Sequence, residues 1–298
     1  MGPSRTGSVA LACATLLLVF AGWFPPAARG GAWTQPPGRG YLRASFAWQS
    51  SRVRFDENGK RVGLEAPGSP RHDTEYRARE IRIYSEYGLL SSFTPYGSLA
   101  YKRLRLLEPS AFVRPRFVPE SVHSTSGLGD VTLGGRYRVR GSPVPLSVAA
   151  EIKVPGGYSS AAIPALGNGK VDVTLRGLAG ASARWAYATA DLGWTRRGGD
   201  YQDELLYSAE VGGRFAGGFY SWRGVLRGRR ALGAPTPSAM DAFDPSLANP
   251  SVLELSAVVG AQVFSGVDVE VSSAHAVSGR NSLAGPVFEV GLAWSPRP

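Results

Sequence analysis

The stretch from Gly127 to Val154 places the tightest constraint on how this chain can fold. Apolar residues alternate with polar or charged residues from Val131 to Val139 and again from Leu146 to Val154, and the turn-forming cluster Arg140–Pro143 lies between the two halves. Successive side chains of a β-strand point to opposite faces of the sheet. The pattern therefore predicts two paired strands that share one apolar face and one charged face.

The same alternation recurs along the chain in about twelve segments of roughly 9–12 residues, the length that a tilted membrane-spanning strand needs. The segments are Tyr41–Ser50, Tyr76–Tyr87, Tyr96–Leu106, Gly127–Val139, Leu146–Val154, Val171–Ala181, Ala186–Thr195, Leu205–Phe215, Tyr220–Arg229, Val252–Val263, Val267–Ala276 and Val287–Trp294.

The connections between these segments alternate between short turns and longer loops rich in proline, glycine and charge. An even number of strands with long loops at one rim and short turns at the other is the layout of outer-membrane barrels. We therefore predict an all-β fold: a transmembrane, antiparallel, up-and-down β-barrel of about twelve strands, with its apolar face toward lipid. A secreted soluble sandwich with that face buried is the alternative, but its strands average only about 5–6 residues. Asn58-Gly59 predicts a small hairpin inside the first long loop.

Residues 1–30 read as a secretory signal peptide, and residues 31–298 as the barrel domain. Arg5 precedes an apolar run that ends at Phe24, and small residues that suit cleavage follow two prolines. We expect cleavage after Gly30 or Ala32; an uncleaved anchor helix is the alternative. Cys13 is the only cysteine and lies inside the run, which excludes disulfides and thiolate sites from the exported chain. The predicted location is the outer membrane of a Gram-negative bacterium.

The formal net charge of +10 points to an anionic partner. Export makes nucleic acid an improbable partner, so we expect none. Many of the arginines fall in or beside the long loops, where guanidinium groups suit the phosphates of lipopolysaccharide. The expected partners are outer-membrane lipid, lipopolysaccharide and an unidentified small molecule; ordinary solvated loop charge is the alternative. Neither metal-ligand spacing nor a phosphate-binding loop occurs, so we expect no metal and no cofactor.

If the apolar face meets lipid, the opposite face lines the lumen and is densely charged. It can form a lattice of ion pairs that fills the barrel, or a selective path. Arg223, Arg227 and Arg229 are the candidates for an anion-attracting strip, unless Arg223 and Arg227 pair with inward carboxylates such as Glu210 and Glu254. The predicted lumen-lining residues are Arg43, Arg82, Lys102, Arg136, Arg138, Glu151, Lys153, Arg176, Glu210, Arg214, Arg223, Arg227 and Glu254.

A hydrolase is a minor alternative, because some outer-membrane barrels are phospholipases with Ser, His and Asn on the outer wall. Ser273 and His275 are two residues apart on one face of a predicted strand, and Asn281 follows. A nucleophile and its base can meet in this way. Asn281 falls in a predicted loop, however, and such Ser/His pairs are common. We therefore expect no enzymatic activity.

Several motifs also resemble a known family. They are Gly31-Ala-Trp-Thr-Gln-Pro36, Gly40-Tyr-Leu42, Gly127-Leu-Gly-Asp-Val-Thr-Leu-Gly-Gly-Arg-Tyr-Arg138, Lys153-Val-Pro-Gly-Gly157 and Leu166-Gly-Asn-Gly-Lys-Val-Asp172. They are similar to the outer-membrane transporter family called "MetA-pathway of phenol degradation". The resemblance implies a channel for small, hydrophobic or aromatic molecules. The alternative is a closed, non-conducting barrel that supports membrane integrity or secretion.

Overall fold

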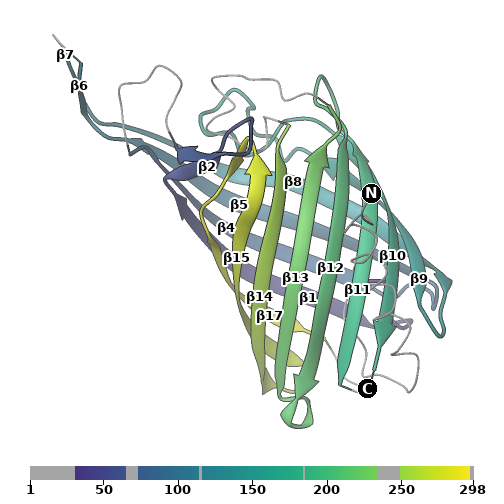
Figure 1. The fold of residues 1–298 in the computed structure, drawn as a ribbon. Coiled ribbons are helices and arrows are strands. Elements are labelled where there is room, and N and C mark those ends of the chain that lie inside the picture. The colour runs from purple at the N-terminus through teal and green to yellow at the C-terminus, as the bar shows by residue number, and fades with distance from the viewer. Residues whose placement is uncertain (1–30, 65–72, 114–115, 184, 234–248, 296–298) are drawn as a thin grey trace, which may run out of the picture.

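A computed structural model describes residues 31–64, 73–113, 116–183, 185–233 and 249–295, and these form a closed antiparallel barrel (Figure 1). Around the barrel the strand order is β1-β17-β15-β14-β13-β12-β11-β10-β9-β8-β5-β4, and β1 also pairs with β4. The strands are β1 (Gly40–Ser51), β4 (Glu75–Tyr87), β5 (Phe93–Glu108), β8 (Ser121–Arg140), β9 (Leu146–Val154), β10 (Asp172–Ser182), β11 (Ala186–Arg196), β12 (Glu204–Phe215), β13 (Tyr220–Ala231), β14 (Ser251–Phe264), β15 (Val267–Arg280) and β17 (Val287–Trp294).

The predicted fold class is confirmed, and so are the twelve alternating segments. The bounds of β9 and β17 agree with the prediction at both ends. The largest difference is at β5 and β8, which continue beyond the predicted Tyr96–Leu106 and Gly127–Val139 to pair Glu108 with Ser121. Apart from Val122, the added stretch of β8 is polar on both faces, so it gives no amphipathic signal, yet its backbone continues the ladder.

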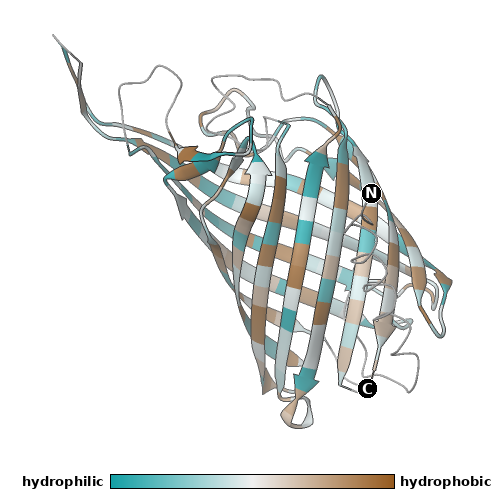
Figure 2. Ribbon diagram, in the orientation of Figure 1, coloured by the Kyte–Doolittle hydropathy of each residue, from teal (hydrophilic) through white to brown (hydrophobic). Residues whose placement is uncertain are grey.

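Figure 2 shows the alternation as banding along each strand. The apolar residues form the exposed outer wall and the polar residues line the lumen. On the outer wall Val148 is 51% exposed and Leu255 is 53% exposed, whereas Ser147, the lumen-side neighbour of Val148, is 3% exposed. A sandwich that buries its apolar face is therefore wrong for this chain. Within the described ranges, no helix is long and apolar enough to cross a membrane.

The two rims differ as predicted, and we call them the long-loop end and the short-turn end. At the long-loop end, β2 (Val53–Phe55) pairs with β3 (Arg61–Gly63) and β16 (Ser282–Leu283). The predicted Asn58-Gly59 hairpin is confirmed, and Gly59 adopts φ +80°, which glycine tolerates without strain. A second hairpin, β6 (Ala111–Val113) and β7 (Arg116–Val118), projects from the same end in Figure 1. At the short-turn end, η1 (Ala216–Gly218) joins β12 to β13.

Candidate functional site: the barrel lumen

The segment Gly31–Pro36 lies inside the barrel near the short-turn end, and we call it the lumen segment. Arg136 donates through Nη1 to the carbonyl oxygen of Gly31 at 3.0 Å, and the Ser147 hydroxyl donates to the carbonyl oxygen of Ala32 at 2.6 Å. Ala32 is 0% exposed, which shows that the barrel wall encloses it. These bonds satisfy backbone groups that would otherwise be buried without partners.

Side chains of the wall fit closely around the lumen segment. The ring of Trp33 packs edge-on against Tyr187 with 6.2 Å between centroids. A Cβ at Gly180 would lie 2.7 Å from the Trp33 ring, so only glycine leaves room for the indole there. The side-chain amide of Gln35 donates through Nε2 to Oε2 of Glu86 at 2.8 Å. The segment is therefore fixed by packing as well as by hydrogen bonds.

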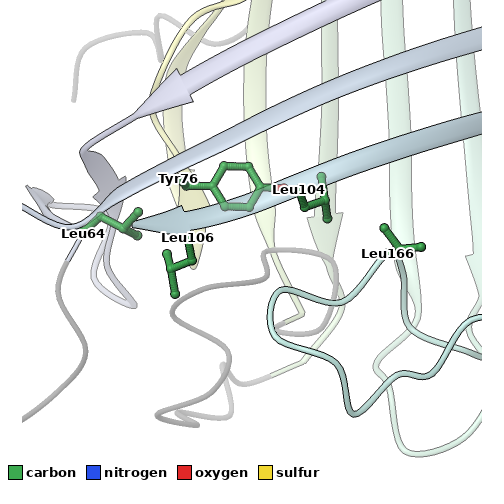
Figure 3. Packing of buried hydrophobic residues seen from close by; sticks show 5 residues of the cluster. All are labelled: Leu64, Tyr76, Leu104, Leu106 and Leu166. Atoms are coloured by element: carbon green, nitrogen blue, oxygen red, sulfur yellow. The ribbon is translucent and has the colours of Figure 1, made fainter. Parts of the chain in front are cut away.

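Toward the long-loop end the lumen is narrowed by apolar side chains. Figure 3 shows this cluster, which consists of Leu64, Tyr76, Leu104, Leu106 and Leu166. Leu166 belongs to the loop between β9 and β10, and the loop is held inward because Lys102 donates to the Leu166 carbonyl oxygen at 3.0 Å and Lys153 donates to Asn168 Oδ1 at 2.6 Å. Leu64 and the loop that carries Leu166 thus help to close this part of the barrel.

A cavity of about 700 Å³ occupies the lumen. Its boundary includes Gly31 of the lumen segment and Ala78, which packs against the apolar cluster. The cavity is lined by seven of the predicted residues, Arg43, Arg82, Arg136, Glu210, Arg223, Arg227 and Glu254. Its volume lies within the range of roughly 300–1,000 Å³ that small-molecule sites occupy.

Ion pairs account for most of the charge on the lumen wall. Arg136 pairs with Glu86 at 2.9 Å, and both side chains are almost fully buried. The other pairs of predicted lumen residues are Arg43 with Glu270 and Glu289, Arg82 with Glu80, Lys153 with Asp130 and Asp172, Arg176 with Glu151 and Asp191, Arg214 with Asp268, and Arg223 with Glu270. Much of the lumen wall therefore carries the lattice of ion pairs that is one of the two arrangements expected from the sequence.

Arg223 pairs with an inward carboxylate, although not with either of the two suggested as examples. Arg223 bonds Glu270 at 2.8 Å, and Glu210 instead accepts the Tyr187 hydroxyl at 2.5 Å. Arg227 lies directly opposite Glu254, and both line the cavity, yet no ion pair within 4 Å joins either to another described residue. Arg223 is thus part of the lattice, whereas Arg227 faces open space. Arg138, on the same face as Arg136, likewise makes no ion pair within the described part of the chain.

The hydrolase arrangement is only partly assembled. Ser273 Oγ and His275 Nε2 are 2.9 Å apart on the outer wall. Asn281 lies in the following turn, where its backbone N–H donates to the Asp56 carbonyl oxygen at 3.2 Å, and no hydrogen bond joins its side chain to His275 in the described structure. Within the described ranges, Asn281 therefore does not orient the histidine as the third residue of such a site would.

Neither a protein-family model nor a curated protein sequence matches this chain. Among solved structures, the COG4313 outer membrane channel from Pseudomonas putida F1 is similar with a TM-score of 0.65 at 12% identity, covering 91% of this chain and 100% of that chain. The KdgM porin has a TM-score of 0.48 at 6% identity over 86% and 99% of the two chains, and the CymD monoaromatic hydrocarbon channel 0.46 at 10% over 89% and 90%. The first of these likenesses shows that the chain has the fold of an outer-membrane β-barrel channel.

Proposed function

We propose that this protein is an outer-membrane channel through which small molecules pass passively or with weak selectivity. The observation that carries the proposal is the charged cavity of about 700 Å³ inside a closed barrel whose outer wall is apolar. In this arrangement the long loops face the outside of the cell and the lumen segment faces the periplasm.

The lining of the cavity supports small polar or ionised organic molecules as the solutes. Arg227 is exposed within the lumen without an ion-pair partner among the described residues, so it can attract an anionic group. Tyr41 and Tyr84 add flat aromatic surface beside the charges. An aromatic acid combines both features. It is one of the aromatic compounds that the family resemblance implies, and it fits this charged lining better than an uncharged hydrocarbon would.

A closed, non-conducting barrel is the second candidate, and one feature favours it. The lumen segment and the apolar cluster narrow the lumen toward both ends. In that case the protein would support the membrane or a secreted partner instead of conducting.

Conductance in planar bilayers separates the two candidates. Two proteins without the signal peptide would be refolded: residues 31–298, and residues 37–298, which lack the lumen segment. Heat-dependent gel mobility would check that each has folded. We expect small channels from chain 31–298 and at least several-fold larger conductance from chain 37–298, because the wall around the segment stays in place. If both chains fold and neither conducts, the channel proposal is wrong and the closed barrel is supported.

A further inference from the structure

Four arginines form a block on the outer wall at the long-loop end of β4 and β5. Arg79 lies directly opposite Arg103, and Arg77 directly opposite Arg105. The next two rows toward the short-turn end pair Ile81 with Tyr101 and Ile83 with Leu99, all of them exposed. The outer wall therefore changes from apolar to cationic within one row. We call Arg77, Arg79, Arg103 and Arg105 the arginine block.

The block stands at the level of an aromatic residue on the neighbouring strand. Arg79 lies directly opposite Trp48 of β1, whose ring stacks on Phe288 of β17 with 5.7 Å between centroids. Tryptophan and tyrosine gather where hydrocarbon gives way to lipid headgroups. The block is thus placed where the headgroups of the outer leaflet would lie.

The part of the chain that the structure describes compensates little of this charge. Among the described residues, only Arg77 of the four has an ion-pair partner, Glu75 at 2.6 Å, and this carboxylate is already engaged because Arg52 also pairs with it at 3.4 Å. Arg79, Arg103 and Arg105 make no ion pair with any described residue, and the buried Nε of Arg105 has no acceptor. Like charges directly opposite each other on a sheet are destabilising, so an external anion is expected.

We propose that the arginine block binds the phosphate groups of lipopolysaccharide in the outer leaflet. This inference rests on the proposed membrane location and assigns the lipid a definite site. Guanidinium groups bind phosphate through two parallel hydrogen bonds. The two rows are about 7 Å apart along the strands and the partners within a row about 5 Å apart, so neighbouring side chains can converge on one phosphorylated sugar. The apolar rows beside the block would hold the acyl chains of the same lipid.

The test compares R79Q/R103Q/R105Q with a control, R61Q/R116Q/R140Q, that loses the same charge at exposed positions outside the block, and so separates the block from general loop charge. Full-length barrels in neutral detergent would be titrated with lipopolysaccharide, with the same lipopolysaccharide after removal of its phosphates, and with inorganic phosphate. Bound lipid would be measured by native mass spectrometry and the unfolding temperature by tryptophan fluorescence. Channel conductance would be recorded for each variant.

We expect the block variant to bind lipopolysaccharide at least about tenfold more weakly than the wild type and the control, since it loses several charge-assisted hydrogen bonds. Without lipid it should be as stable as the wild type or more so, because repulsion is relieved. Lipopolysaccharide should raise the unfolding temperature of the wild type and the control only. Equal binding by the block variant, equal binding of the phosphate-free lipid, or the same stabilisation by inorganic phosphate would overturn the inference. Failure of the channel proposal would appear separately, as loss of conductance in every variant.

Discussion

At the scale of single residues, the contrast between Arg223 and Arg227 is the most informative feature of the lumen. Both belong to β13 and face inward, yet Arg223 bonds Glu270 and Arg227 makes no ion pair within the described ranges. Removing a charged group from a lattice of ion pairs changes the stability of the protein. Removing one that faces open solvent changes the electric field in the lumen instead. These two arginines of one strand should therefore have different roles, Arg223 in stability and Arg227 in the selectivity of the lumen.

Arg223→Gln and Arg227→Gln test this division. We expect Arg223→Gln to lower the free energy of unfolding by roughly 1.5–3 kcal/mol, because a hydrogen bond to a charged group is lost. Arg227→Gln should change it by less than about 0.5 kcal/mol, while the reversal potential in a salt gradient shifts toward cations. Urea unfolding in lipid vesicles and bilayer recordings measure the two effects. Equal effects of both substitutions on stability would contradict the division.

Alternation in the sequence places Arg223 inside the barrel but cannot identify Glu270 as its partner. The pair joins β13 to β15 across β14. Gly260 of β14 lies directly opposite Glu270 and has no side chain to crowd this carboxylate. That choice depends on the register of three strands, which a strand pattern does not specify.

At the scale of the strand, the two faces should respond differently to charge. Val148→Arg and Leu255→Arg place a cation on the exposed apolar wall, and each should destabilise the assembled barrel by roughly 2–4 kcal/mol near the bilayer midplane. Ser272→Arg, which points into the cavity, is the matched lumen substitution and should be milder. The folded fraction after refolding into vesicles measures each effect, and comparable losses for both faces would refute the assigned facing.

Ser147 shows why a lumen position is not automatically tolerant. It lies on the polar face of β9, as the alternation indicates, but it is 3% exposed and holds the carbonyl oxygen of Ala32. Sequence alternation reports which face a residue belongs to and not what fills the interior. The strands could therefore be predicted from the alternation. The position of Gly31–Pro36 inside the barrel could not, because this segment carries no alternation of its own.

At the scale of the whole molecule, the lumen segment favours one of the two cleavage sites that we expect from the sequence. Cleavage after Gly30 keeps the carbonyl oxygens that bond Arg136 and Ser147, whereas cleavage after Ala32 removes both residues that carry them. We expect the exported protein to begin at Gly31, and the intact mass of the barrel extracted from membranes will check this. A mature chain that begins at Trp33 would contradict it and leave these two wall side chains without those acceptors.

The lumen segment and the strand that completes the ring are parts of one continuous stretch of chain. Pro36 is followed within four residues by Gly40, the first residue of β1, and β1 pairs with both β4 and β17. We therefore expect sealing of the wall and filling of its interior to happen together during biogenesis. An assembling molecule would then pass from an open, curved sheet to an occupied barrel without an intermediate pore, and the permeability barrier of the cell would stay intact while each new copy is inserted.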